Sequence, residues 1–261
     1  MSAYHQQSKK NQRSSSSLSV PGEVADALHN TPDATDSISL RMNKYVRGGE
    51  GLKLNEWSAI CKCAKNNACK VSPMEIPGAK SFTAVLRGRM MVDHSGVLLN
   101  ASLNLHRFFG YPVIPGSALK GISRQAAKLA VDAGELRWED WQRIWGNEPG
   151  SNGKDKGQLQ AGTVAFLAAE PTNDQWKLVV DILNYHQDCD YENPNPVFFP
   201  AVERGAKFTF TIFPLRKKYA KPEDSDIALE YLQKALKENG VGAKTAAGYG
   251  WFGEFQWDKQ L

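Results

Sequence analysis

Long apolar runs are missing from this sequence. No stretch of its 261 residues approaches the roughly 18 consecutive apolar residues that a membrane-spanning helix needs. The N-terminus also lacks the layout of a secretory signal. We therefore expect a cytoplasmic protein that has no membrane partner and folds mainly as one large domain.

Cysteine is also scarce, with four residues at positions 61, 63, 69 and 189. They do not form a disulfide framework, and a reducing cytosol keeps such thiols reduced. Cys61, Cys63 and Cys69 could be three zinc ligands, but their spacing matches no common structural zinc site. We expect small buried or half-buried thiols, with no metal and no cofactor.

The two familiar glycine-rich nucleotide-binding motifs are absent, although residues 240–250 contain four glycines. A Walker A loop has glycine directly before its Lys-Thr pair, where this chain has Ala243, and the dinucleotide fingerprint has glycine where Thr245 stands. The run also joins a helical pattern to a strand pattern, which is the reverse of the order in nucleotide-binding folds. It still suits a phosphate chain, because glycines expose backbone amides around Lys244.

A strong net charge is missing as well, since the formal charge is only +4. Residues 81–131 and 203–221, however, each contain six basic residues against one acidic residue. Acidic residues gather elsewhere, at 135–140 and 188–192. The separated signs indicate a basic face that can follow a polyanion, with a salt-balanced surface as the alternative.

Composition divides the chain into three parts. Residues 1–38 are rich in Ser, Gln and Asn and lack a sustained apolar period, so we expect a disordered N-terminal tail. Residues 39–80 mix apolar and basic residues and are expected to form an accessory helical segment. Residues 81–261 are expected to form the main domain.

The main domain alternates strand and helix patterns. Apolar residues recur with period two in residues 82–90 and 207–213 and at helical spacing in the two longer helices. Residues 163–169 and 178–183 are short apolar runs with strand character. Without the extra hairpin-like pieces the order is β-α-β-β-α-β, so we expect an α+β, ferredoxin-like (RRM-like) fold. The strands are expected at residues 82–90, 163–169, 178–183, 207–213 and 251–257, the longer helices at 118–131 and 227–238, and a short helix around Trp138, Trp141 and Trp145.

A cationic edge is expected on the first of the longer helices. Ser117 follows a Pro-Gly turn and can cap this helix, whose first amides and dipole favour an anion. Lys120, Arg124 and Lys128 recur at i, i+4 and i+8 along one side, which is also the pattern of an ordinary polar helix face. Together with the glycine run, and with Tyr249 as a base-stacking plane, this edge describes a sequence-independent grip on a phosphodiester backbone.

Two motifs resemble those of a known family. Residues 113–124, with the sequence V-I-P-G-S-A-L-K-G-I-S-R, resemble the P-x-I-P-G-S-S-L-K-G-x-x-R signature of the RAMP superfamily, the RNA-binding subunits of CRISPR effector complexes. The glycine run resembles the G-rich motif of that family, in the family's order. The likeness covers about residues 81–257 and, through residues 181–186, is greatest to sixth-numbered subunits of the type III-B (Cmr) complex.

The resemblance implies that both motifs contact the guide RNA. It also implies an inserted thumb hairpin between residues 185 and 196, which would contain His186 and Tyr191 and reach over the guide and target strands. Asn184 and Tyr185 depart from the family's Thr-Pro pair. The implied RNA-binding residues are Ser117, Lys120, Gly121, Arg124, Gly240, Gly242, Lys244, Thr245, Gly248 and Gly250, to which the base-stacking interpretation adds Tyr249.

Groups able to cut RNA are few. A metal-independent ribonuclease needs a histidine or lysine to move a proton from the attacking 2′-hydroxyl, and His94, His106 and His186 are candidates that also have structural explanations. Residues 104–107 have no carboxylate where, by resemblance, the target-cutting backbone subunit carries an aspartate. We therefore expect a chain that is not an enzyme. The alternative is an endoribonuclease that processes guide RNA with a histidine general base.

The resemblance also implies the partners. They are the CRISPR guide RNA, the target RNA and other Cmr-complex subunits, especially the backbone RAMP subunit and the neighbouring 3′-end subunit. In this ribonucleoprotein of antiviral defence, the chain would cap the backbone filament near the 3′ end of the guide.

Overall fold

The structure is a computed structural model, and its described residues are 38–39, 54–63, 76–92, 103–147, 161–172, 175–185, 195–216 and 218–257. Apart from residue 38, the tail predicted at residues 1–38 lies outside these ranges. None of the described helices is both long enough and apolar enough to cross a bilayer.

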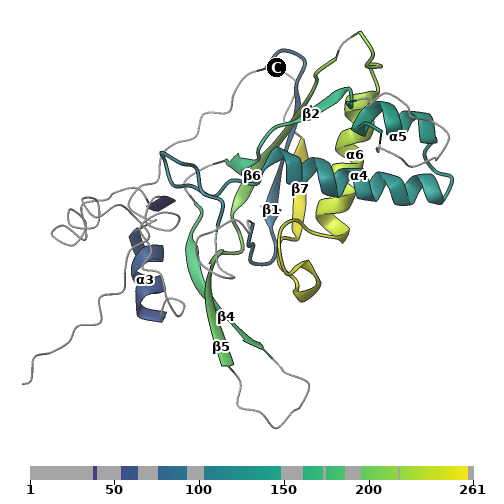
Figure 1. Cartoon of the computed structure of the whole chain (residues 1–261). Helices are drawn as coiled ribbons and strands as arrows, with labels where there is room; N and C mark the ends of the chain where they lie inside the picture. Colours follow the sequence, from purple (N-terminus) through teal and green to yellow (C-terminus); the bar gives the residue numbers. More distant parts are fainter. Residues whose placement is uncertain are drawn as a thin grey trace, which may run out of the picture.

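A five-stranded antiparallel sheet forms the centre of the described structure (Figure 1). Four strands follow the order β2-β6-β1-β7, and the short strand β3 also pairs with β6. The strand bounds are Lys80–Leu86 for β1, Val164–Phe166 for β2, Glu170–Pro171 for β3, Lys207–Pro214 for β6 and Phe252–Trp257 for β7.

The apolar side of this sheet follows from the period-two pattern of β1 and β6. Their antiparallel register places Phe82 opposite Phe210 and Ala84 opposite Phe208, and all four side chains are fully buried. The Phe82 and Phe210 rings stack with their centroids 5.0 Å apart. Burial of such large rings removes much apolar area from water, so this register is strongly favoured.

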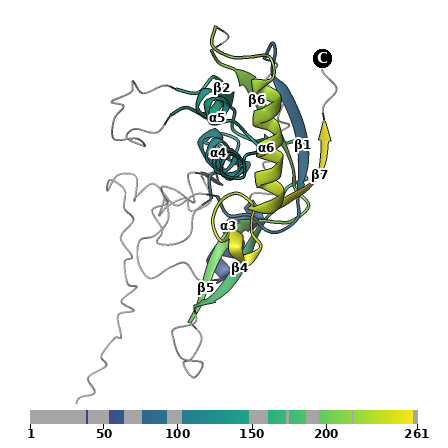
Figure 2. The ribbon, with the colours of Figure 1, turned by 90° about the vertical axis from the view of Figure 1, so that its right-hand side faces the viewer.

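Helices α4 (Gly116–Asp132) and α6 (Asp224–Glu238) cover that apolar side of the sheet, and α5 (Trp138–Trp145) packs on both of them. Figure 2 shows α4 and α6 on one side of β1 and β7. The hydroxyl of Ser123 on α4 is buried between the other two helices. It donates to the Ala228 carbonyl and accepts a hydrogen bond from Trp145 Nε1 at 3.2 Å. The helices therefore join through polar as well as apolar contacts.

Strands β4 (Leu178–Tyr185) and β5 (Asn195–Val202) form a separate two-stranded hairpin that extends away from the main sheet (Figure 1). Helix α3 (Leu54–Cys63) contacts this hairpin and buries Trp57. The sequence predicted β4 but missed β5. Two prolines in its sequence N-P-V-F-F-P-A-V argue against a strand, and only an edge position in a hairpin tolerates them.

Helix α4 begins earlier than the sequence predicted, and the predicted capping role of Ser117 is wrong. The N-cap is Pro115, no side chain caps the helix, and Ser117 lies exposed in the first turn. Gly116 explains the shift, because a Cβ atom there would overlap the Phe166 carbonyl oxygen of β2. The chain can therefore start the helix directly against the sheet. The mixture of helices with antiparallel strands confirms the predicted α+β class.

Candidate nucleic-acid interface

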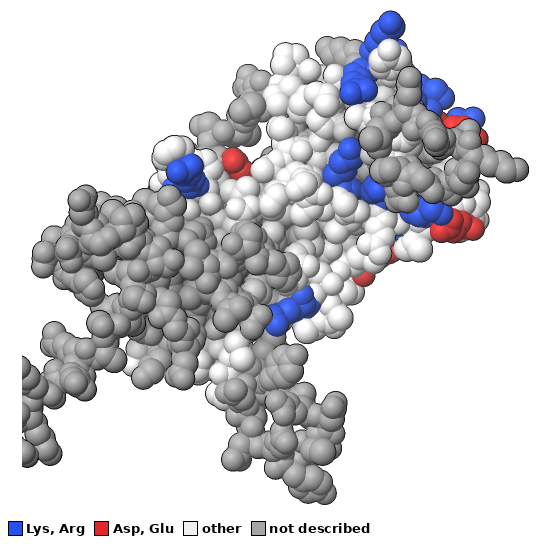
Figure 3. Space-filling model, in the orientation of Figure 1, with Lys and Arg blue, Asp and Glu red and all other residues white. Residues whose placement is uncertain are grey.

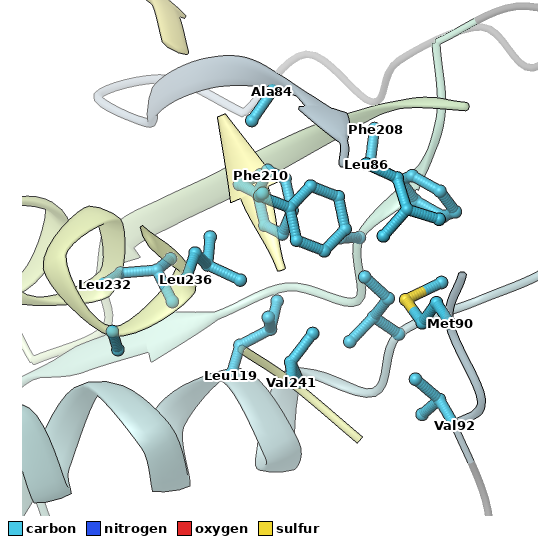
Figure 4. Close-up of a cluster of buried hydrophobic side chains, with 14 of the residues drawn as sticks. Ala84, Leu86, Met90, Val92, Leu119, Phe208, Phe210, Leu232, Leu236 and Val241 are labelled. Carbon is cyan, nitrogen blue, oxygen red and sulfur yellow. The ribbon is translucent and has the colours of Figure 1, made fainter. Parts of the chain in front are cut away.

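The two predicted RNA-binding segments lie close together. Figures 1 and 2 both show the 240–250 loop, in yellow, next to α4. Leu119 of α4 and Val241 of the loop belong to one cluster of buried side chains (Figure 4). Lys120 directly follows Leu119 and is half-buried. Lys244 comes three residues after Val241 and is exposed. The fold thus brings both motifs to one region without burying the loop lysine.

The predicted cationic edge of α4 is only partly open. The Arg124 guanidinium carbon lies 4.6 Å from the centroid of the Trp141 ring, and Lys128 Nζ lies 5.4 Å from that of Trp138. Lys128 also pairs with Asp132. Two of the three cations therefore pack against α5, which the spacing along one helix could not reveal.

Lys120 has a different environment from the other two cations. Burial, followed by repulsion from Arg124, lowers the pKa of Lys120. Among the described residues no carboxylate forms an ion pair with it, and Gly121 beside it is exposed. Lys120 is therefore the α4 cation best placed to meet an anion.

The backbone of the 240–250 loop is more self-contained than the glycine pattern suggested. The Gly250 amide donates to the Arg89 carbonyl at 2.7 Å, and the Ala243 amide donates to the Met91 carbonyl at 2.8 Å. Other amides close turns within the loop, so the prediction of generally bare amides is wrong. Within the described part of the chain, backbone acceptors are lacking for the amides of Gly242, Lys244, Thr245 and Ala246.

Those four amides surround a left-handed turn. Lys244 has φ 61° and ψ 30°, an uncommon conformation for a residue with a side chain, and a 3-10 turn over Thr245–Ala247 follows it. Thr245 is half-buried, and its carbonyl accepts a hydrogen bond from Trp251 Nε1 at 2.9 Å. The hydrogen bond from Trp251 therefore fixes the turn, while Lys244 stays exposed.

The glycines of the two motifs fall into two groups. A Cβ atom at Gly240, Gly242 or Gly250 would overlap the protein's own atoms, and Gly240 and Gly250 are buried. Gly240 and Gly250 therefore shape the loop, and their contact with RNA stays a prediction. Gly121 and Gly248 are exposed, with nothing within 4 Å of an added Cβ atom. Space above these two remains for a ligand.

Tyr249 anchors the loop to the β4–β5 hairpin. Its hydroxyl donates to Asp181 Oδ2 at 2.5 Å, and its half-buried ring lies 6.0 Å from the Phe199 ring. Burial, together with this hydrogen bond, raises the pKa of Tyr249 to about 12. The Tyr249 ring therefore packs against the hairpin, and its base-stacking role stays a prediction.

Asp181 receives a second partner from the end of β1. Arg89 Nη1 lies 2.5 Å from Asp181 Oδ1. Burial alone would raise the pKa of Asp181, but the hydrogen bonds from Arg89 and Tyr249 outweigh burial and hold that pKa below its usual value. Neither Arg89 nor Asp181 was predicted as a site residue, since no local pattern pairs positions so far apart.

The Tyr249 anchor gives a pH-dependent prediction. Tyr249→Phe should lower the free energy of unfolding by about 1.5 kcal/mol at neutral pH, because a hydrogen bond to a carboxylate is lost. The pKa of Asp181 is depressed in the folded state, so this bond stabilises above the unfolded pKa and is lost as the pH falls. Urea unfolding should therefore show a difference between wild type and variant that shrinks below about pH 4.

Tyr219→Phe is the matched control, because it removes the same hydroxyl from an exposed ring. It should change the free energy of unfolding by less than about 0.5 kcal/mol at every pH. A Tyr249→Phe difference that stays constant from neutral to acid pH would contradict the anchor.

Other predicted residues are less informative. His186 and Tyr191 of the predicted thumb, and the candidate base His94, lie outside the described residues. His106 is described, and its Nδ1 accepts hydrogen bonds from the amides of Phe108 and Phe109. Its ring is thus engaged in local structure.

The cysteine cluster is described only in part. Cys61 is buried, and burial raises the pKa of its thiol to about 12, so it stays protonated. This agrees with the predicted buried thiol at that position. Cys69 and Cys189 lie outside the described residues, which contain no group of His, Cys, Asp and Glu arranged to hold a metal ion.

Basic side chains reach the surface on the side that Figure 3 shows. Lys and Arg atoms form several separate patches there, and Asp or Glu atoms lie beside some of them. Lys244 also lies near the hairpin, with Nζ 5.3 Å from the centroid of the Phe199 ring. The face therefore combines positive charge, open glycines and backbone amides, which together suit a phosphodiester chain.

Comparisons with known proteins identify relatives of this chain. The CRISPR system Cmr subunit Cmr6 of Pyrococcus furiosus is 26% identical over an alignment of 208 residues, which covers 57% of this chain and 60% of that protein. The match therefore spans less than two thirds of the relative's length. Among solved structures, a cryo-EM structure of the type III-B Cmr-beta bound to cognate target RNA gives a TM-score of 0.49 at 20% identity, covering 78% of this chain and 66% of that one.

The crystal structure of Cmr6 from Pyrococcus furiosus gives a TM-score of 0.42 at 22% identity, covering 67% of this chain and 97% of that one. The model of the RAMP superfamily matches residues 46–253, which include both motifs and most of the chain. The chain belongs to the RAMP superfamily.

Proposed function

We propose that this chain is a non-catalytic RNA-binding subunit of a type III-B CRISPR effector complex. In this role it caps the backbone filament near the 3′ end of the guide RNA, supports target binding, and contacts the backbone subunit and its 3′-end neighbour. The family membership and the likeness to a Cmr subunit support this assignment. The observation that carries it is that the α4 motif and the glycine loop adjoin through buried Leu119 and Val241, while Lys244 and two open glycines remain exposed.

The fold supports the same assignment at a finer level. Strand order β2-β6-β1-β7, with α4 between β1 and β2 and α6 between β6 and β7, is the order of a ferredoxin-like (RRM-like) unit. We assign the β4–β5 hairpin to the thumb of this unit. Its base adjoins the glycine loop through Asp181 and Tyr249, so a strand held at the loop would lie beside the hairpin.

The test of this function is a binding titration of the purified chain with labelled single-stranded RNA over a range of salt concentrations. The logarithm of the affinity should fall linearly with the logarithm of the salt concentration, because bound phosphates release counterions. The same RNA, incubated with the chain with and without divalent metal, should remain intact. Discrete cleavage products that disappear in a His94, His106 or His186 variant would instead support a guide-processing endoribonuclease.

A substitution at Gly121 should change protein stability and RNA binding in opposite directions. Glutamine is a far better helix former than glycine, so Gly121→Gln should raise the free energy of unfolding by about 0.5 kcal/mol. The new side chain would fill the open space above α4 and weaken RNA binding by at least about fivefold, the equivalent of one lost hydrogen bond. Gly134→Gln is unsuitable as a control because Gly134 has a positive φ.

Ala133→Gln, on the exposed end of the same helix, is the better control and should leave RNA binding unchanged. Tighter RNA binding by the Gly121→Gln variant would argue against a strand lying over this part of α4.

A further inference from the structure

A tight turn over residues 106–111, here termed the aromatic turn, precedes α4. The His106 amide donates to the Tyr111 carbonyl at 2.7 Å, and the Gly110 amide donates to the His106 carbonyl at 2.8 Å. Leu105 and Pro112 continue the pairing on either side. Gly110 has φ 71°, which suits glycine at the sharp bend. The turn is therefore closed by its own backbone.

The rings inside the turn make it rigid. The His106 ring stacks on Phe109 at 4.9 Å and on Tyr111 at 4.6 Å between centroids. Its Nδ1 accepts hydrogen bonds from the Phe108 and Phe109 amides at 3.3 and 3.2 Å. These contacts fix the backbone at Phe108, so a partner does not have to order the turn.

The same turn presents apolar rings to solvent. Phe108 is 79% exposed and Phe109 is 47% exposed. An exposed Phe ring forgoes the free energy that burial would provide. The stacked rings behind Phe108 do not require Phe108 to be exposed. The exposed pair is therefore suited to a planar ligand.

The aromatic turn lies next to the candidate interface. Residues 112–115 connect it to α4, and an extended segment of that length spans at most about 17 Å from Tyr111 to Gly116. At its base the Asn104 amide donates to the Val92 carbonyl at 2.7 Å, and Val92 also borders Gly242 of the glycine loop. A single strand held at Lys120 and Lys244 would reach the turn within a few nucleotides.

We propose that the aromatic turn binds an unpaired RNA base by stacking on Phe108, with Phe109 beside it. This inference rests on the proposed RNA-binding function and adds a residue to it. Two rings provide far less area than the roughly 800 Å² per partner of a standard protein interface, which favours a base over a protein surface. Every base has a π-face, so the contact adds affinity without sequence preference.

Three variants of Phe108 test the proposal in the full-length chain. Phe108→Ala should weaken binding of single-stranded RNA by about 5- to 150-fold, the range for one lost base stack, and leave the salt dependence unchanged. Phe108→Leu should weaken it nearly as much, because leucine keeps the apolar character but not the flat ring. Phe108→Tyr should bind like the wild type. The high exposure of Phe108 means that the fold tolerates all three.

RNA carrying 2-aminopurine at successive positions reports stacking directly through its fluorescence. One position should change its fluorescence on binding to the wild type and lose that change in Phe108→Ala. Unchanged affinity in Phe108→Ala, or full binding by Phe108→Leu, would overturn the proposal, and the latter would indicate an apolar pocket of a protein partner.

Failure of the proposed function would look different. If replacing Lys120 and Lys244 leaves RNA binding unchanged, and if binding does not depend on salt, then the proposed phosphate contacts are contradicted. The 2-aminopurine signal tests only the aromatic turn.

Discussion

Replacing Lys120 and Lys244 with glutamine is expected to weaken RNA binding by about 60-fold in roughly 0.05 M salt and by about tenfold in roughly 0.2 M salt. Each phosphate contact to a single strand contributes about 0.7 to the slope of log affinity against log salt, so the slope should fall by about 1.4. Glutamine keeps much of the length of lysine, which preserves the packing of its stem. A fluorescence anisotropy titration at several salt concentrations measures both quantities.

The matched control is the pair Lys234→Gln and Lys237→Gln on α6. It removes the same two charges from residues that were not predicted to bind RNA, and Lys237 is exposed. Its slope should equal that of the wild type. If both double variants lower the slope equally, then RNA binding follows the net charge and not the interface, and the proposed site is contradicted.

Removing Arg143 is expected to cause a large loss of stability. Arg143 Nη2 lies 2.7 Å from Asp224 Oδ1, and its Nε also donates to this carboxylate, which is completely buried. Arg143→Ala leaves that charge unpaired, and such a change costs about 3–5 kcal/mol. Thr163 Oγ1 and the Lys221 amide still donate to Asp224, so we expect about 3 kcal/mol.

Arg143 also supports a second carboxylate, that of Asp140. Burial alone would raise the pKa of Asp140, but hydrogen bonds from Arg143 and Arg137 outweigh it and lower that pKa. Arg137→Ala is the matched control, because its side chain pairs with Asp140 but is 72% exposed. Chemical denaturation should show a loss below about 1 kcal/mol for Arg137→Ala. Similar losses in the two variants would show that burial of the pair is energetically unimportant.

Much of the fold could be predicted because its signals are local. Alternating apolar residues predicted β1 and β6, other strand patterns predicted β4 and β7, and helical spacing predicted α4 and α6. Strand β5 was missed because its prolines oppose a strand locally, while pairing with β4 overrides them. The start of α4 was misplaced because Gly116 meets β2, a neighbour distant in sequence.

The site shows the same limit. The sequence singled out two motifs that lie near each other in the structure. It did not predict that Tyr249 donates a hydrogen bond to Asp181, 68 residues away. The sequence analysis also treated Lys120, Arg124 and Lys128 alike. In the structure Arg124 packs on the Trp141 ring, and Lys128 packs on the Trp138 ring. Residue type and spacing cannot distinguish a cation that faces solvent from one that packs on a ring.

The sequence by itself determined most of the helices and strands, their order along the chain, and the membership of its two motifs in one family. These depend on side-chain periodicity and on short motifs, which adjacent residues encode. Only the tertiary structure decided which glycines are open, which cations remain available and which carboxylates are buried. Those properties depend on contacts such as Arg143 with Asp224, 81 residues apart, whose free energy exists only once the chain has folded.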